Sequence, residues 1–438
     1  MYNSTAGAGP GVRGGGYFMT KNIFLILLQL CLPAVCRAAA FDLPALNARG
    51  VIAAASAAPA VPAAPALKEW TVMVFINSKN NLEEFGLRDL NEMETVGSSD
   101  GVSIVAELGR VKGYYAGDGD WTGVRRYLVR KDADAAKIGS PVLEDLGAAD
   151  MGDYKSVIDF VRWAKAAYPA KKYMLVVWNH GSGWTRGLNA ARGISYDDES
   201  GSHINIPQLG RVLAETGGVD VYASDACLMQ MAEVAWEIKD YAAYIVGSEE
   251  TEPADGYAYG PLLGGLTAAP GMAPAQLAAL AVDTYGAYYS AQGLGATQSA
   301  LKTSAMPGFL RLMNAFTAAV TEAGDKGVVK RGLYYAQHYA YADNKDLDSF
   351  VSYVVLRSQS PRVRGAGAEL LAYVRGELVT RKGASNYAQP VEGLDPVDYP
   401  AAGGIAVYLP GARAAAGYAE LKWAKDSAWD EFLRWIVP

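Results

Sequence analysis

The chain has 438 residues, of which 51% are hydrophobic and 19% are charged. This composition supplies enough apolar side chains for a large core, which excludes a mainly disordered chain. The 39 basic and 46 acidic residues give a formal net charge of −7, so the chain lacks the basic excess of general nucleic-acid binders. Three cysteines and three histidines are too few for a disulfide scaffold or a multi-cysteine zinc module.

The N-terminal region is predicted to lie outside the folded body. The apolar run Ile23–Val35 is shorter than the roughly 20 residues of a comfortable transmembrane helix. Ala38–Ala40 fits the small-residue rule for signal cleavage, so residues 1–40 are predicted to be a signal peptide, with 1–18 as an upstream extension. An uncleaved anchor is the alternative. Residues 41–67, rich in Ala and Pro, are predicted to be a linker or pro-segment.

A signal peptide predicts a secreted, periplasmic or cell-surface protein with no stable membrane association after cleavage. Cleavage would also remove Cys31 and Cys36, which leaves Cys227 as the only cysteine of the exported chain. A lone cysteine cannot form an internal disulfide, so Cys227 is either an inert buried thiol or a reactive one.

From Lys68 onward, short apolar strands alternate with amphipathic helices. The predicted strands are Val72–Asn77, Val102–Leu108, Tyr173–Asn179, Val219–Asp225 and Tyr244–Ser248, and Trp121–Arg130 is predicted to form a strand or a hairpin. The predicted helices are Leu82–Val96, Tyr154–Ala167, Pro207–Thr216 and Leu228–Lys239. Because strand and helix alternate, residues 68–261 are predicted to form an α/β core whose mostly parallel central sheet carries helices on both faces.

The second half of the chain, residues 262–438, is predicted to be more helical. The predicted helices are Pro274–Gln292, Pro307–Ala323, Asp346–Ser360, Val363–Lys382 and Tyr418–Ile436. Two of them begin with proline, which suits the first helical position because its missing N–H costs nothing there. One late strand, Gly404–Leu409, is predicted to join the core sheet.

Two strand ends carry the residues of greatest chemical interest. His180 follows one buried strand where it runs into a glycine loop, and Cys227 follows the next buried strand. A loop, a helix and a strand separate them, and a right-handed crossover of this kind places the two strands parallel and usually adjacent. We therefore expect both residues at the carboxyl edge of the sheet, where open α/β folds place their sites.

This pair suits nucleophilic catalysis. A free thiol has a pKa of about 8.5, and a helix beginning just after Cys227, or an imidazole nearby, would lower it. The imidazole of His180 could then protonate a leaving amine. Considered singly, a cysteine at a strand end is more often a small core residue and a histidine more often a structural group. Their joint placement favours catalysis.

The strongest motifs are His-Gly-Ser-Gly-Trp at 180–184 and Asp-Ala-Cys-Leu-Met at 225–229. In this order they resemble the clostripain-like cysteine peptidases, relatives of caspases, gingipains and legumains. The resemblance spans about residues 68–438, with further matching stretches at 70–82, 89–94, 248–256 and 404–410 and at Glu233. It implies a caspase-like fold and a secreted cysteine endopeptidase that cleaves peptides or proteins after Arg or Lys.

The resemblance also implies roles for individual residues. Cys227 would be the nucleophile and His180 its partner in a dyad, with the backbone N–H groups of Gly181 and Cys227 as oxyanion donors. Asp225 and Asp255 would be acids of the S1 pocket, which recognise a basic side chain by charged hydrogen bonds. The structural alternatives are an acid at a helix N-terminus for Asp225 and a turn residue for Asp255.

The remaining candidates lie in the loop Thr185–His203. Its acidic run Asp197–Glu199 has ligands suited to a structural Ca²⁺, with an ordinary solvated loop as the alternative; the implied chemistry itself needs no cofactor or metal. Arg192 and Arg186 each precede a glycine in this polar loop, where proteolytic nicking concentrates. The resemblance implies self-processing of a zymogen, so cleavage is predicted after Arg192, with Arg186 second, against the alternative of a single working chain.

Two other functions remain open at this point. A non-catalytic caspase-like module would keep the fold and bind peptides or partner proteins without turnover. Another thiol chemistry, such as transpeptidation, would use the same pair of residues. The intact His180 and Cys227 favour the peptidase over the binding module.

Overall fold

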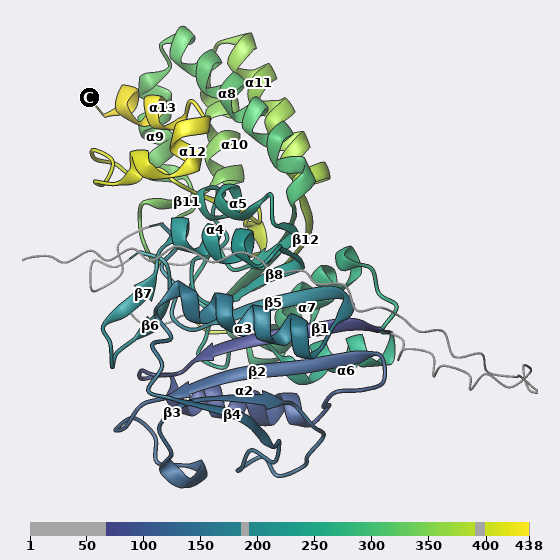
Figure 1. Cartoon of the computed structure of the whole chain (residues 1–438). Coiled ribbons are helices and arrows are strands. Elements are labelled where there is room, and N and C mark those ends of the chain that lie inside the picture. The colour runs from purple at the N-terminus through teal and green to yellow at the C-terminus, as the bar shows by residue number, and fades with distance from the viewer. Residues whose placement is uncertain (1–66, 185–191, 390–398, 438) are drawn as a thin grey trace, which may run out of the picture. The chain divides into compact units, whose positions relative to one another are not determined.

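The computed structural model describes residues 67–184, 192–389 and 399–437 (Figure 1). The predicted signal peptide, with Cys31 and Cys36, lies outside the described residues, as does all of the predicted linker before Leu67. Within the described residues, no helix is both long and apolar enough to span a membrane.

A nine-stranded sheet in the order β12-β10-β9-β8-β5-β1-β2-β3-β4 forms the centre of the described chain. Its strands are β1 (Lys68–Asn77), β2 (Val102–Arg110), β3 (Gly123–Leu128), β4 (Val142–Gly147), β5 (Ala170–Trp178), β8 (Val219–Asp225), β9 (Ala242–Gly247), β10 (Ala296–Lys302) and β12 (Val379–Ser385). The middle strands β9, β8, β5, β1 and β2 are parallel, and they are the five parallel strands that the apolar runs predict. The outer strands are antiparallel to their neighbours.

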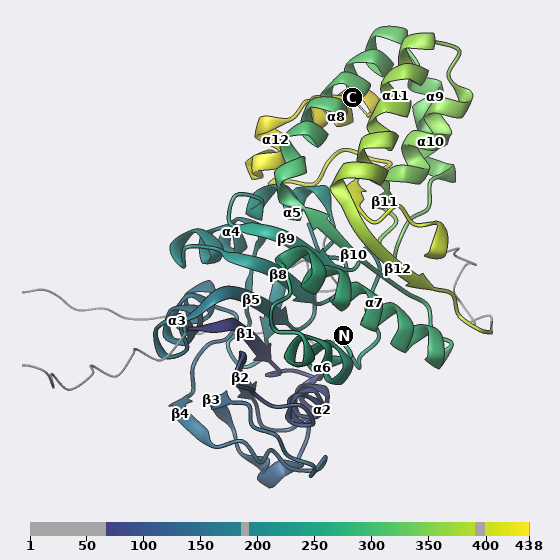
Figure 2. The same ribbon diagram turned by 90° about the vertical axis from the view of Figure 1, so that its right-hand side faces the viewer.

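Helices cover both faces of this sheet (Figures 1 and 2). One face carries α3 (Tyr154–Ala167), α4 (Ile206–Glu215) and α5 (Ala232–Ile238), and the other carries α2 (Glu83–Glu94), α6 (Tyr259–Ala268) and α7 (Pro274–Gln292). Alternate residues of β1 serve the two layers: Met73 and Phe75 pack in the first core cluster, and Val72 and Val74 in the second. The predicted α/β class with helices on both faces is confirmed.

The later half of the chain is mainly helical, as predicted. Its helices are α8 (Met306–Ala323), α9 (Lys326–Tyr335), α10 (Leu347–Arg357), α11 (Pro361–Tyr373), α12 (Lys422–Asp426) and α13 (Trp429–Ile436). The small strands are β6 (Ile194–Asp197), β7 (Ser202–Ile204), β11 (Asn344–Asp346) and β13 (Ala406–Tyr408), and the short helical turns are η1 (Asp118–Asp120), η2 (Thr303–Ala305), η3 (Val374–Leu378), η4 (Tyr399–Ala401) and η5 (Tyr418–Glu420).

The late strand does not join the large sheet, contrary to the prediction. β13 pairs with β11, and a single bridge joins its Ala406 to Met231. The edge position next to β10 is taken by β12, which comes from the end of the segment predicted to be one helix over Val363–Lys382. The helix α11 passes into the η3 turn, and β12 follows that turn directly into the sheet beside β10.

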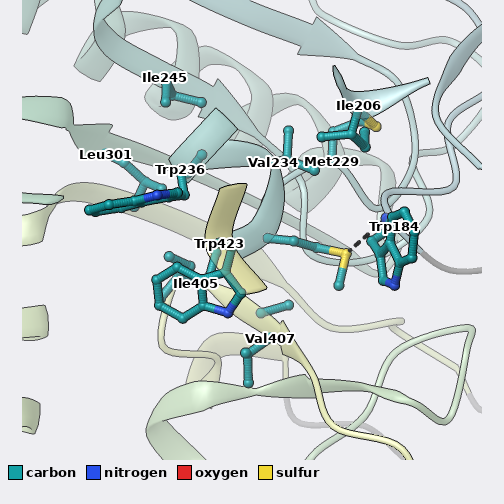
Figure 3. Packing of buried hydrophobic residues seen from close by; sticks show 14 of the residues in the cluster. Trp184, Ile206, Met229, Val234, Trp236, Ile245, Leu301, Ile405, Val407 and Trp423 are labelled. Carbon is teal, nitrogen blue, oxygen red and sulfur yellow. Dashed lines mark hydrogen bonds between the residues drawn. The ribbon is translucent and has the colours of Figure 1, made fainter. Parts of the chain in front are cut away.

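The C-terminal segment nevertheless shares the main core (Figure 3). Trp423 packs edge-on against Trp236 of α5, with ring centroids 5.9 Å apart, beside Val407 of β13. Ile245 of β9 and Leu301 of β10 lie in the same fully buried cluster. Burial of side chains of this size contributes about 1.5–3 kcal/mol each, so the late segment and the sheet are expected to be stable only together.

Candidate functional site

The chain ends that follow β5 and β8 lie side by side. These strands are parallel neighbours, with Trp178 opposite Asp225, so the next residues of both leave the same edge of the sheet. Gly181 packs directly on the backbone of Cys227: a Cβ atom added to the glycine would lie 2.4 Å from the Cys227 carbonyl oxygen. The predicted adjacency of the two strands is therefore confirmed, and it brings the His180 and Cys227 segments together.

A strained turn presents the thiol of Cys227. Leu228 has a φ of +64°, a conformation that side chains other than glycine rarely adopt, and its N–H donates to the Glu250 carbonyl oxygen at 3.0 Å. The backbone N–H of Glu252 donates to Cys227 Sγ at 3.3 Å. The loop after β9 thus holds both the turn and the sulfur.

The helix after Cys227 begins later than predicted. α5 starts at Ala232 rather than Leu228, because the intervening residues bond to the segment after β9 instead, with the Gln230 N–H donating to the Ser248 carbonyl. No helix N-terminus therefore directly follows the thiol. Burial raises the pKa of Cys227, which favours the protonated thiol over the thiolate.

The His180 imidazole is oriented by the loop after β1. Its Nε2 lies 2.8 Å from Asn81 Oδ1, a partner that the sequence analysis did not identify. With Nε2–H donating to this oxygen, Nδ1 remains unprotonated and available as a base. Burial lowers the pKa of His180, which favours this neutral form. Within the described residues no hydrogen bond joins the imidazole to the thiol; contacts of this kind often tighten only with substrate.

The backbone N–H of Gly181 is not used in the β-bridge that Gly181 forms with Ile194. The antiparallel bridge between Gly181 and Ile194 is closed by the N–H groups of Ser182 and Ser195. The built Cβ position on Gly181 lies 3.2 Å from Cys227 N, so the two N–H groups predicted to face an oxyanion belong to touching segments.

Asp225 lies at the end of β8, two residues before the thiol, with 4% of its surface exposed. Its Oδ2 accepts hydrogen bonds from the Tyr259 hydroxyl at 2.8 Å and from the Tyr257 N–H at 3.2 Å. Burial raises the pKa of this carboxyl to about 6. Asp225 is therefore a buried acid that is held by neutral donors.

Asp255 contacts different residues from those that contact Asp225. Its carboxylate pairs with Arg88 of α2 at 3.1 Å, and the Tyr288 hydroxyl lies 3.4 Å from it. These residues line a cavity of about 290 Å³ together with Asp89. Asp255 thus lies near a hollow with an acidic wall, but its charge already has a partner.

Two further acids near the site were not singled out by the sequence analysis. Asp89 is buried and accepts a hydrogen bond from Trp178 Nε1 at 2.6 Å, and Glu252 lies next to the thiol through its backbone N–H. The available signal for Asp89 was its position on the apolar side of α2, between Leu87 and Leu90, where an unpaired acid is unusual. Both acids also lie in stretches that match the resembled family, Asp89 in 89–94 and Glu252 in 248–256.

The acidic run after the His180 loop has partners within the protein. Lys79 Nζ lies 3.1 Å from Asp197 and 2.5 Å from Glu199, and Asp198 accepts from the Tyr114 hydroxyl at 2.6 Å. No group of three or more His, Cys, Asp or Glu residues in the described parts of the chain is arranged to hold a metal ion.

Arg192, the first predicted self-cleavage residue, is half-buried and held by neighbouring residues. Its Nη1 donates to the Ala416 carbonyl at 2.6 Å, and its guanidinium lies 4.5 Å from the Trp184 ring centroid. Arg186, the second, lies outside the described residues. The other two histidines are separate from the site: His203 stacks on Tyr196, and His338 bridges Lys345.

Comparisons with known proteins agree with this architecture. The sequence model of the clostripain family matches residues 74–435. Clostripain of Hathewaya histolytica is 29% identical over 187 residues, which cover 39% of this chain and only 36% of that protein.

Two solved structures match nearly their full length. A secreted C11 cysteine protease from Bacteroides thetaiotaomicron, in complex with an irreversible peptide inhibitor, is 22% identical with a TM-score of 0.62, covering 84% of this chain and 99% of that one. An inactive zymogen C11 protease from Parabacteroides distasonis is 18% identical with a TM-score of 0.60, covering 83% and 99%. These likenesses confirm the predicted caspase-like fold.

Proposed function

Because the chain belongs to the clostripain family of cysteine peptidases, we propose that it is an exported cysteine endopeptidase that hydrolyses peptide bonds after Arg or Lys. The observation that carries this proposal is the juncture of β5 and β8. Cys227 and His180 follow neighbouring parallel strands, and the buried acid Asp225 stands two residues before the thiol. The predicted signal peptide and the secreted relative from B. thetaiotaomicron support export.

Cys227 and His180 supply the reaction. His180 takes the thiol proton as the sulfur attacks the scissile carbonyl carbon, and the N–H groups of Gly181 and Cys227 stabilise the resulting oxyanion. The imidazolium then gives its proton to the leaving amine, which leaves a thioester on Cys227. A water that loses its proton to His180 hydrolyses the thioester and restores the thiol. These steps use no metal or cofactor.

The free enzyme keeps this pair neutral. Burial raises the pKa of Cys227 and lowers the pKa of His180, and both shifts oppose a thiolate–imidazolium pair. Proton transfer is therefore expected to accompany substrate binding, when the substrate carbonyl and the oxyanion donors stabilise the developing charge.

Asp225 supplies the preference for a basic P1 side chain. A buried carboxylate with only neutral donors around it gains a large interaction energy when a guanidinium or ammonium group arrives. We propose Asp255 as a second S1 acid, acting at longer range because Arg88 already pairs with it.

The loop after His180 is proposed to be processed by the enzyme itself, after Arg192 first and Arg186 second. In the described conformation Arg192 is bound to the Ala416 carbonyl and the Trp184 ring, so it has to leave these contacts before it can enter an active site. N-terminal sequencing of aged active enzyme should find new termini at Gly193 or Gly187. The Cys227→Ala protein should stay intact.

The test of the function is turnover of fluorogenic peptides with Arg, Lys or a neutral residue at P1. Cys227→Ala should abolish turnover, and His180→Ala should lower kcat by about 10²–10⁴-fold, as is typical of general acid–base groups. Near-normal activity of Cys227→Ala would overturn the mechanism. A protein that binds Arg peptides without cleaving them would be the non-catalytic module instead.

A further inference from the structure

The guanidinium of Arg192 occupies a binding site that the proposed reaction does not use. Its Nη1 donates to the Ala416 carbonyl at 2.6 Å, and its central carbon lies 4.5 Å from the centroid of the Trp184 ring. Gly417 lies against the same group, because a Cβ atom built on it would be 3.4 Å from Nη1. A carbonyl acceptor combined with an aromatic face suits an arginine side chain, which donates hydrogen bonds in its plane and stacks through its flat surface.

This guanidinium site forms part of a larger cavity. The cavity has a volume of about 320 Å³, and its walls include Trp184, Arg192, Tyr341, Asp343 and Tyr408. The three aromatic rings suit the apolar stem of a long basic side chain, and the carboxylate of Asp343 suits its charge. When Arg192 leaves, the cavity loses a cation but keeps the carboxylate and the aromatic faces.

Both sides of the cavity are connected to the turn that carries the thiol. On one side, Gly183 precedes the tryptophan and packs on the Leu228 carbonyl oxygen, which lies 2.4 Å from its built Cβ position. On the other side, the Ala340 N–H donates to Glu250 Oε1 at 3.0 Å, and the Glu250 carbonyl accepts from the Leu228 N–H at 3.0 Å. Leu228 directly follows the nucleophile, so the cavity lies close to the point of cleavage.

The cavity is distinct from the acid that is proposed to form S1. Asp225 is bonded to Tyr257 and Tyr259, and none of these three residues lines the cavity. Two separate sites for a basic side chain therefore lie near the thiol, and Arg192 occupies one of them in the intact chain.

We propose that this cavity is a second specificity subsite, which binds an arginine side chain of the substrate once Arg192 has left it. This inference rests on the proposed cleavage after Arg or Lys. The substrate arginine takes over the contacts with the Trp184 ring and the Ala416 carbonyl, while the P1 side chain enters S1. The processed enzyme therefore selects for two basic residues. Arg is favoured over Lys in the second subsite because a planar guanidinium stacks on the indole and donates to the carbonyl at the same time.

Pairs of peptides that differ in a single charge test the subsite. Every peptide has Arg at P1, and the two members of a pair have Arg or citrulline at one further position; citrulline has nearly the shape of arginine but no charge. The pairs cover the three positions before P1 and the three after the scissile bond. Binding to the full chain carrying Cys227→Ala would be measured by calorimetry, because this chain neither cleaves the peptides nor processes itself. We expect the two members of each pair to bind equally, since Arg192 holds the subsite.

Adding Arg192→Gln removes the occupant of the subsite. At one position the Arg peptide should then bind about threefold to thirtyfold more tightly than its citrulline partner, the range that a cation on an indole face provides. Further addition of Trp184→Leu should abolish this preference and leave the preference for Arg over citrulline at P1. Trp121→Leu is the matched control: the Trp121 ring carries the Arg125 guanidinium at 4.1 Å but does not line the cavity, so its replacement should leave both preferences unchanged.

The outcomes separate this subsite from the proposed function. No preference at any position of the Arg192→Gln chain, or a preference that Trp184→Leu leaves unchanged, would overturn the subsite while keeping the basic S1 site. Equal binding of P1 Arg and P1 citrulline peptides would overturn both.

Turnover gives a second measurement if the intact chains bind none of the peptides or if Trp184→Leu does not fold. The self-processed enzyme should cleave the Arg peptide of one pair faster than its citrulline partner, and Asp343→Asn should reduce the difference. Equal rates for every pair, with Arg still required at P1, would overturn the subsite alone.

Discussion

Two groups of acidic residues lie close to the same end of the sheet, and they differ in how the charge of their carboxylates is compensated. In the run Asp197–Glu199, the buried ammonium of Lys79 bridges two carboxylates, and Asp197 also accepts from the backbone N–H of Met151 at 3.0 Å. Near the thiol, Asp225 and Glu252 form no ion pair within the described residues, and burial raises the pKa of both carboxyls. One group is neutralised from within the chain, and the other is not.

This difference separates a structural acid from a binding acid. Burying a carboxylate costs several kcal/mol unless a partner compensates it, so an ion-paired acid contributes to folding only with that partner present. A buried acid without such a partner keeps a raised pKa. The cost of burying its charge is compensated only when a cationic ligand binds beside it. The contrast predicts which substitutions will damage the fold and which will damage recognition.

The largest effect on recognition is expected from Asp225→Asn. Loss of the buried partner of a P1 cation should cost about 2–5 kcal/mol, or roughly 30- to several-thousand-fold in kcat/KM for Arg substrates. The thermal midpoint at pH 7.5 should not fall. Folding raises the pKa of this carboxyl from 3.8 to about 6. Its contribution to the stability of the folded protein therefore becomes less favourable as the pH rises through this window.

Asp197→Asn is the matched comparison for Asp225→Asn. It removes a carboxylate of similar burial that is paired with Lys79, so it should lower the thermal midpoint and leave the ratio of Arg to neutral P1 activity unchanged. A loss of P1 selectivity in Asp197→Asn, or its retention in Asp225→Asn, would remove the distinction between the two groups of acids.

The largest effect on stability is expected from Lys79→Met. The substitution leaves Asp197 buried without its cation, which should cost about 3–5 kcal/mol in urea unfolding. Lys171→Met is the control, because the pair of Lys171 with Glu69 is exposed and should contribute only about 0–1 kcal/mol. Equal losses in the two variants would show that burial does not set the value of the Lys79 contacts.

A smaller effect on rate is expected from Asn81→Ala. The amide oxygen orients His180, so its loss should lower kcat about tenfold, part of the 10²–10⁴-fold that an acid–base group supplies, without changing P1 selectivity. Asn81→Asp places a negative charge beside Nε2 and raises the pKa of His180, which should move the acidic limb of the pH–rate profile to higher pH. An unmoved limb would argue against this contact.

The parallel centre of the fold could be predicted because its strands are continuous apolar runs covered on both faces. Of the antiparallel outer strands, β3 lies within the predicted segment Trp121–Arg130, whereas β4, β10 and β12 could not be predicted. β4 exposes Val142 and Leu143 and has no burial pattern to detect, and β10 carries buried polar residues, among them Ser299, whose hydroxyl lies 2.8 Å from Gln230 Nε2. These polar residues are satisfied only by partners far away in the sequence.

The residues of the candidate site also separate into those that the sequence could predict and those that it could not. His180, Cys227 and Asp225 follow or end parallel strands, so topology alone brings them together. Asn81 and Glu252 come from loops whose approach depends on tertiary contacts, and nothing local in the sequence indicates which side chain they will meet. The self-cleavage sites and the roles of the individual S1 acids stay predictions.

The smallest effect is expected from Asp255→Asn, and its sign tests whether this acid serves the substrate at all. Asp255 is partly exposed and already paired with Arg88, so its removal should lower kcat/KM for Arg substrates by less than about tenfold, a value typical of an exposed pair of about 0–1 kcal/mol. Arg88→Gln is the decisive partner variant. If Asp255 attracts the P1 cation, removing its pairing with Arg88 should raise kcat/KM for Arg substrates. The increase should vanish in the double variant Arg88→Gln/Asp255→Asn. If both single variants leave the ratio of Arg to neutral P1 activity unchanged, the pair is structural. A loss in Asp255→Asn that exceeds the loss in Asp225→Asn would make Asp255 the principal S1 acid.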